Sequence, residues 1–167
     1  AGNMGHFQGL DVAIRAAAAL DPGHAVDLVL MGSGLARPEL ERLVEELASP
    51  HVRLMPAVAP AESMAYLASA DAHLISLIDL PFFAATIPGK TQVAMAHGRP
   101  AIVAVRGDAA DLVRTADAGV ATTPTKGGFE RAFSELGQMS ARRLAELGAN
   151  GRKYYDEHLT LGRAAAQ

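Results

Sequence analysis

The apolar positions of this chain switch repeatedly between the spacing of a helix and the continuous runs of a buried strand. Residues 10–20 place leucine, isoleucine and alanine on one helical face, and the next apolar run, residues 26–31, is short and uninterrupted. The same criteria predict helices at 38–48, 61–69, 90–97 and 109–115, and strands at 51–55, 71–77, 100–105 and 120–123. A mostly helical tail is predicted from about residue 129, with breaks near Gly148 and Gly162.

Strands that alternate with helices, several of them apolar throughout, predict a parallel sheet covered on both faces. Right-handed crossovers then give a doubly wound, Rossmann-like α/β fold, and we expect residues 1–167 to form one such domain. Ligands of these sheets bind where the strands end. The loops there, at 2–9, 32–34, 56–60, 78–90 and 106–108, are therefore expected to converge on one crevice.

Composition removes several classes of function. The chain has 167 residues, no cysteine and a net charge of -3, which excludes disulfides and thiol chemistry and argues against a nucleic-acid partner. The histidines are scattered along the chain, so we predict no metal site. We expect a cytoplasmic protein and, because no strand precedes the first loop, a piece of a longer one.

The clearest candidate chemistry is Pro88-Gly89-Lys90 at the start of a predicted helix. Free N–H groups and the positive end of the helix dipole make such a position suited to an anion. A lysine in a first turn opposes that dipole and needs a reason, and a phosphate ligand is one. The alternative is an ordinary loop whose lysine points into water.

Ordered blocks across nearly the whole chain resemble one family. They are Ala1–Gly5 with Gln8–Leu10, Leu30–Gly34, Val52–Pro56, Thr86–Lys90, Gly98–Pro100 and Asn150–Tyr154. The sequence resembles the C-terminal, donor-binding domain of retaining family 4 glycosyltransferases (group 1), which have a GT-B architecture of two Rossmann-like domains. Within that family it is similar to the bacterial branch that builds capsule, colanic acid and O-antigen.

The resemblance implies a nucleotide-sugar site at the strand ends. Asn3, Gly5 and Gln8 would face the diphosphate, residues 32–34 would let the backbone approach the nucleotide, and Val58 with Ala57 would border the base. The loop from Phe83 would hold the sugar and phosphates. The implied nucleotide-sugar-binding residues are Asn3, Gly5, Gln8, Gly32, Ser33, Gly34, Val58, Phe83, Ala85, Thr86, Ile87, Pro88, Gly89 and Lys90. No catalytic residue, cofactor or metal is assigned.

The resemblance also implies partners: a nucleotide-sugar donor, with UDP expected, and an N-terminal acceptor domain that these residues do not include. An apolar inter-domain face left exposed could pair in a dimer, and the intact enzyme could lie against the inner membrane face. Family members often carry two glutamates where this sequence has Ala85 and Val93, so ribose must be held in another way. The alternative function is a nucleotide-binding or partner-docking module without catalysis.

Overall fold

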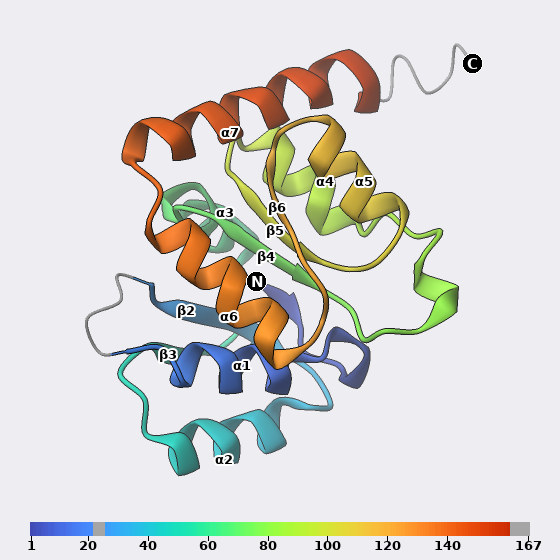
Figure 1. Cartoon of the computed structure of the whole chain (residues 1–167). Helices are drawn as coiled ribbons and strands as arrows, with labels where there is room; N and C mark the ends of the chain where they lie inside the picture. The colour runs from blue at the N-terminus through green and yellow to red at the C-terminus, as the bar shows by residue number, and fades with distance from the viewer. Residues whose placement is uncertain (22–25, 161–167) are drawn as a thin grey trace.

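The computed structural model describes residues 1–21 and 26–160. Parallel strands and helices alternate along it (Figure 1). The strands are β1 (Gly2–Asn3), β2 (Leu28–Ser33), β3 (Val52–Met55), β4 (His73–Ser76), β5 (Ala101–Ala104) and β6 (Gly119–Ala121). The α-helices are α1 (Leu10–Ala18), α2 (Arg37–Leu47), α3 (Pro60–Ser69), α4 (Gly89–Ala96), α5 (Asp108–Thr115), α6 (Lys126–Gly137) and α7 (Ala141–Tyr154).

The strands form two three-stranded parallel sheets, in the orders β1-β2-β3 and β4-β5-β6. Residues 28–31 of β2 pair in register with residues 52–55 of β3, and residues 73–76 of β4 pair with residues 101–104 of β5. β1 pairs with β2 only at Gly2 and Asn3. The fold is Rossmann-like as predicted, and the sheet is divided between β2 and β4.

Burial of β5 on both faces shows how the core is arranged. Ile102 and Ala104 pack into a cluster with α1, α2 and α6, whereas Ala101, Val103 and Val105 pack with α4 and α5. The alternation follows from the two-residue period of a strand. An uninterrupted apolar run is therefore needed here, which is why this strand was predicted correctly.

The C-terminal half differs from the prediction in where its helices break. α6 begins at Lys126 and ends at Gly137, and α7 runs through Gly148 without interruption. Thr125 and Ser140 cap the two helices, each by accepting a hydrogen bond from the backbone N–H group three positions further on. The helix of residues 155–159 (η3) has π geometry, and Gly162 lies outside the described residues.

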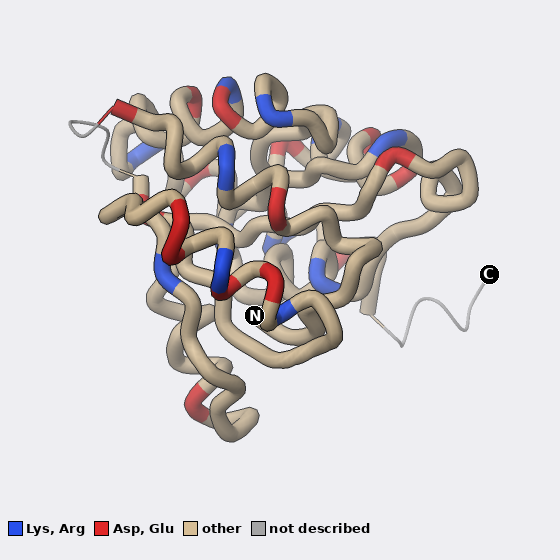
Figure 2. The backbone as a smooth tube through the Cα atoms, turned by 90° about the horizontal axis from the view of Figure 1, so that it is seen from below, with Lys and Arg blue, Asp and Glu red and all other residues tan. Residues whose placement is uncertain are grey.

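The first loop also differs from the prediction. Residues 2–3 form β1 instead of irregular loop, and His6–Gln8 form a short 3₁₀ helix (η1). A second 3₁₀ helix (η2) covers Pro81–Phe83 before α4. Among the described residues, no helix combines the length and the apolar character that a bilayer span requires. Basic and acidic positions are interspersed on the face seen in Figure 2.

Candidate functional site

The carboxyl ends of β1 and β2 lie close enough that only glycine fits between them. Gly32 has φ +146°, and a Cβ added there would lie 1.8 Å from the carbonyl oxygen of Gly2. Gly34 has φ +152° and faces Met4 and the side-chain oxygen of Asn3. These glycines bring Asn3, Ser33 and Gly34 together at one edge, where Asn3 and Ser33 are exposed and Gly34 is half-buried.

The turn after β1 is held by its own side chains. Gly5 N–H donates to Gln8 Oε1 at 2.8 Å, and the Asn3 amide lies beside Gly5. The oxygen of Gln8 is therefore used to shape the loop. Asn3 itself is exposed at the strand end, where it could meet a ligand.

Arg37 joins the ends of β2 and β3, a role that the sequence interpretation missed. Its Nη1 donates to Gly32 O at 2.6 Å and to Met55 O at 2.7 Å, and its Nε donates to Glu41 at 2.8 Å. An arginine in the first turn of a helix opposes the dipole just as a lysine does, but the local sequence does not show that this one joins two strand ends. Here the carbonyl groups at the strand ends compensate for that cost.

A small hollow of about 130 Å³ lies where β2 meets the loop after β3. Its lining comprises Gly2, Met31, Gly32, Ser33, Ala57, Val58 and Ser63. Val58 therefore lies against the glycine edge, and the walls are small or apolar; that Val58 borders a base stays a prediction. Such a surface suits the flat face of a base better than a charged group.

The positive end at the start of α4 is not neutralised by an acidic first-turn residue or a side-chain cap. Among the described α-helices, α4 alone has neither an acidic residue in its first turn nor a side-chain cap. Its first-turn residue Lys90 has no carboxylate partner within the described chain. In contrast, Lys126 at the start of α6 pairs with Glu130 at 3.1 Å. The helix end and the ammonium group are both available to an anion.

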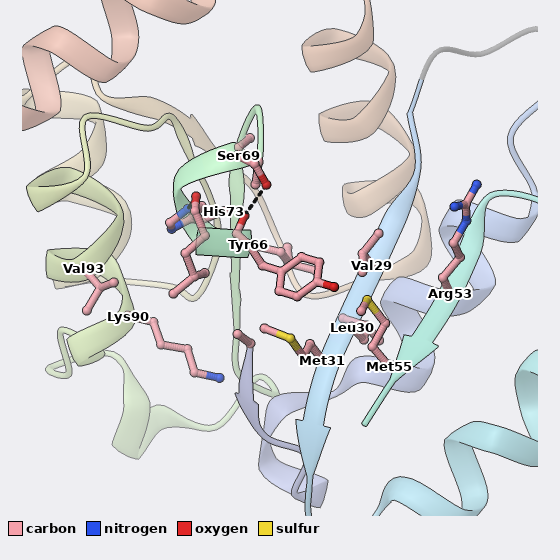
Figure 3. A pocket seen from close by; sticks show the side chains of 15 residues that line it. Val29, Leu30, Met31, Arg53, Met55, Tyr66, Ser69, His73, Lys90 and Val93 are labelled. Carbon is pink, nitrogen blue, oxygen red and sulfur yellow. Dashed lines mark hydrogen bonds between the residues drawn. The ribbon is translucent and has the colours of Figure 1, made fainter. Parts of the chain in front are cut away.

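Lys90 reaches from α4 to the end of β1. A Cβ added at Gly2 would lie 3.3 Å from both Cε and Nζ of Lys90. In Figure 3 the amine points into a hollow, with Met31 pointing towards it from β2. The residue as a whole is exposed, but its amine lies among protein atoms, and this partial burial lowers the pKa of Lys90.

The loop before α4 is fastened to the first loop through Phe7. Ile78 N–H donates to Phe7 O at 2.9 Å, and the Phe7 and Phe83 rings meet edge to face with centroids 5.8 Å apart. Asp79, in the same loop, forms an ion pair with Arg106 at 2.8 Å. Phe83 thus belongs to the same edge as the first loop.

Residues 85–89 form the approach to α4 and are held mainly within their own segment. Thr86 N–H donates to Phe83 O at 3.0 Å, and Thr91 N–H donates to Pro88 O at 2.8 Å. Ala85, Ile87 and Gly89 are exposed, and a Cβ at Gly89 would meet nothing within 4 Å. The structure gives these residues no contact with the glycine edge, so their place at the site stays a prediction.

Among the described residues, no group of three or more histidines, aspartates or glutamates is arranged to hold a metal ion. His6 lies 3.9 Å from Glu39, and His97 Nδ1 lies 2.7 Å from Val93 O in its own helix. What the strand ends offer instead is exposed backbone, one unpaired cation and a helix N-terminus. That combination suits a phosphate-bearing ligand.

Parallel strands, flanking helices and a glycine-lined carboxyl edge define a Rossmann-like domain. The sequence profile described as "Glycosyl transferases group 1" matches residues 1–138. This chain belongs to that family. No curated protein matches the sequence.

Solved structures give the same fold at low sequence identity. Anabaena HepE in complex with UDP is 19% identical with a TM-score of 0.81, and the match covers 99% of this chain and 46% of that one. Sucrose-phosphate synthase from Thermosynechococcus elongatus is 22% identical with a TM-score of 0.78, covering 99% and 42%. This chain therefore spans about half the length of these structures.

The C-terminal domain of LpcC from Francisella tularensis, a group 1 family glycosyl transferase, is 15% identical with a TM-score of 0.74. That match covers 96% of this chain and 84% of that one. The fold therefore corresponds closely in extent to one domain of a larger architecture.

Proposed function

We propose that this chain is the donor-binding half of a retaining family 4 glycosyltransferase that takes a UDP-linked sugar. Family membership supports glycosyl transfer. The main observation behind the site is Lys90, which has no carboxylate partner among the described residues and lies at the uncapped start of α4, adjacent to Gly2. The intact enzyme is proposed to act in bacterial polysaccharide or glycoconjugate synthesis, in the cytoplasm or at the inner membrane face.

In this proposal the diphosphate lies between the first loop and α4. Lys90 and the first N–H groups of α4 stabilise the negative charge that develops on the leaving diphosphate. Gly32 and Gly34 admit the nucleotide, and the hollow beside Val58 takes the base. That HepE was solved with UDP and with UDP-glucose supports the choice of nucleotide.

The sugar is proposed to lie against residues 83–89, with the acceptor delivered by a second domain. Phe83 would form the floor, and exposed backbone N–H groups of this segment would bind sugar hydroxyls and phosphate oxygens. No side chain of this chain is assigned to attack or proton transfer. Catalysis would therefore take place between the two domains.

The test is a calorimetric titration of the 167-residue chain with UDP, with GDP and ADP as controls for the base. Lys90→Ala is expected to weaken UDP binding by about 1–3 kcal/mol, the range for a lost charge-assisted hydrogen bond. Lys153→Ala, which changes an exposed lysine in the last turn of α7, is the matched control and should leave affinity unchanged. Equal affinity for the wild type and Lys90→Ala would remove Lys90 from the site.

The second candidate is a nucleotide-binding module that does not catalyse transfer. Ala85 and Val93 favour it, because they stand where the resemblance leads one to expect two carboxylates. Nucleotide binding without turnover, measured after a complete N-terminal half is joined to this chain, would support this candidate. Turnover would exclude it.

A further inference from the structure

A separate cavity of about 480 Å³ lies beside β6, an outer strand of its sheet. α5 and α6 flank it, because α5 packs on one face of the sheet and α6 on the other. Its lining shares no residue with the hollow beside Val58 or with the cavity that Lys90 borders. The volume of this cavity lies in the range of small-molecule sites.

Three arginines from three different elements line the cavity. Arg106 follows β5, Arg114 lies in the last turn of α5, and Arg131 lies in α6. Glu135 is the one carboxylate in the lining, so positive side chains outnumber negative ones there by three to one. The whole chain has a net charge of -3, so this grouping of guanidinium groups runs against its overall charge.

The three guanidinium groups keep N–H donors for a ligand. Arg131 forms no ion pair within the described part of the chain. Arg106 uses Nε for Asp79, and Arg114 uses Nη1 for Asp111. The side chains of Arg106 and Arg114 are each 59% exposed, so their remaining donors are accessible. A planar guanidinium with free N–H groups suits bidentate recognition of a phosphate or a carboxylate.

The walls of the cavity are fixed before any ligand binds. Gly107 has φ +80°, and a Cβ there would lie 2.1 Å from Ala84 O, so the turn that carries Arg106 is held closely against the loop before α4. On the other side, Thr122 Oγ1 donates to Gly128 O at 2.9 Å, which ties the end of β6 to α6. A preformed site loses little conformational entropy on binding.

From these observations we propose that the cavity between α5 and α6 binds a small multivalent anion that carries phosphate or carboxylate groups. Arg131 binds it most directly, because no protein carboxylate competes for its guanidinium group. Arg106 and Arg114 bind through the donors that their ion pairs leave free, and Glu135 weakens binding by repulsion. This inference does not depend on the proposed function, since the cavity shares no lining residue with the candidate donor site.

The test is a titration of the isotope-labelled 167-residue chain with sodium pyrophosphate and, separately, with sodium citrate. Ionic strength is held constant with sodium chloride, so that screening does not change during the titration. Amide shifts of Gly107, Thr122 and Thr123 report this cavity, and those of residues 2–9 and 86–90 report the candidate donor site. Saturable shifts at the cavity amides are expected, and the anion with the lower Kd identifies the preferred group as phosphate or carboxylate.

Variants of the lining test the assignment of charges. Arg131→Ala is expected to raise the Kd about tenfold, as for a lost charge-assisted hydrogen bond. Glu135→Gln should lower the Kd by about threefold, because it removes a repulsive charge. Arg42→Ala is the matched control and should leave the Kd unchanged. Arg42 is likewise an exposed arginine on a helix, forms no ion pair among the described residues and lies outside this cavity.

Several results would overturn the proposal. They are the lack of saturable shifts at the cavity amides with either anion, an unchanged Kd in Arg131→Ala, and an equal loss in Arg42→Ala, which would indicate general surface charge. Shifts of Gly107 that disappear in Lys90→Ala would also overturn it, because they would report the donor site. The amide spectrum of each variant shows whether it is folded, and Glu135→Gln tests the cavity without altering Arg131.

Discussion

Lys90 is the side chain on which the electrostatics of the candidate site depend. It has no carboxylate within reach among the described residues, its helix has an uncapped start, and burial lowers its pKa. In the free protein each of these features disfavours the ammonium form. A bound diphosphate would have the opposite effect, because it would supply the missing negative charge and so favour the ammonium form.

This reversal predicts a pH dependence of binding. UDP affinity should fall as the pH rises through the lowered pKa of Lys90, since the free protein must then take up a proton to bind. Lys90→Arg keeps its charge over the same range and should give a flat profile. Titration calorimetry from about pH 7 to about pH 10, where phosphate groups stay ionised, measures both. A parallel decline in Lys90→Arg would assign the effect to another group.

His73 provides a second prediction, on stability. Its side chain is buried, Nε2 lies 2.8 Å from Leu67 O, and burial, with smaller contributions from His97 and Arg99, lowers its pKa. Below about pH 6.5 the unfolded chain therefore binds more protons than the folded one, so acidification should reduce the free energy of unfolding. Urea unfolding at about pH 7.5 and about pH 5.5 should show a smaller loss in His73→Asn than in the wild type. His6→Asn, at an exposed histidine, should behave as the wild type does, and an undiminished loss in His73→Asn would contradict the assignment.

At the scale of elements, α7 packs against the turn that follows α4 through two glycines, Gly148 and Gly98. A Cβ at Gly148 would lie 2.0 Å from Gly98 O and 2.8 Å from Gly98 C, which are backbone atoms that cannot move aside. Gly148→Ala is therefore expected to lower the free energy of unfolding by about 1–3 kcal/mol through overpacking. Gly127→Ala is the matched control, because a Cβ there meets only Arg131 Nη1 at 3.6 Å. Chemical denaturation measures both, and a loss confined to Gly127→Ala would refute the packing argument.

The same glycine explains why the helix breaks were mispredicted. Glycine weakens a helix in isolation, so the sequence pattern placed a break near Gly148. The structure uses that position for close contact with Gly98 and ends α6 at Gly137 instead. Helix propensity cannot distinguish a glycine that ends a helix from one that allows close packing within it. The packing contact here joins residues 50 positions apart in the sequence, Gly98 and Gly148.

Other features were accessible from local pattern alone. β5 required no tertiary knowledge, because burial on both faces makes every residue of the strand apolar. Lys90 was likewise visible as a charge placed against a dipole, and its role in binding a diphosphate stays a prediction. The link from Arg37 to Met55 O was not visible, because it depends on the distance between two strand ends. The division into two sheets could not be predicted either, because the sequence pattern indicates how many strands there are but not which of them pair.

At the scale of the whole molecule, this chain matches one domain of larger architectures. It covers 46% of HepE but 84% of the C-terminal domain of LpcC. Exposed apolar side chains gather on the loop before α4, where Leu80 is 41% and Phe82 81% exposed. A second domain that closes over the strand ends would cover this loop and exclude water from the diphosphate.

Binding and transfer should therefore separate experimentally. Because the acceptor would come from another domain, we expect the 167-residue chain to bind UDP but to transfer no sugar from UDP-sugar donors. Nucleotide binding is followed by amide shifts of residues 2–9, 32–34 and 86–90, and transfer by release of UDP in the presence of candidate acceptors. Release above the rate of uncatalysed hydrolysis from this chain alone would show that the strand ends carry the complete catalytic machinery. Release that appears only when the N-terminal half is joined, and that disappears again in Lys90→Ala, would place Lys90 in the transfer reaction itself.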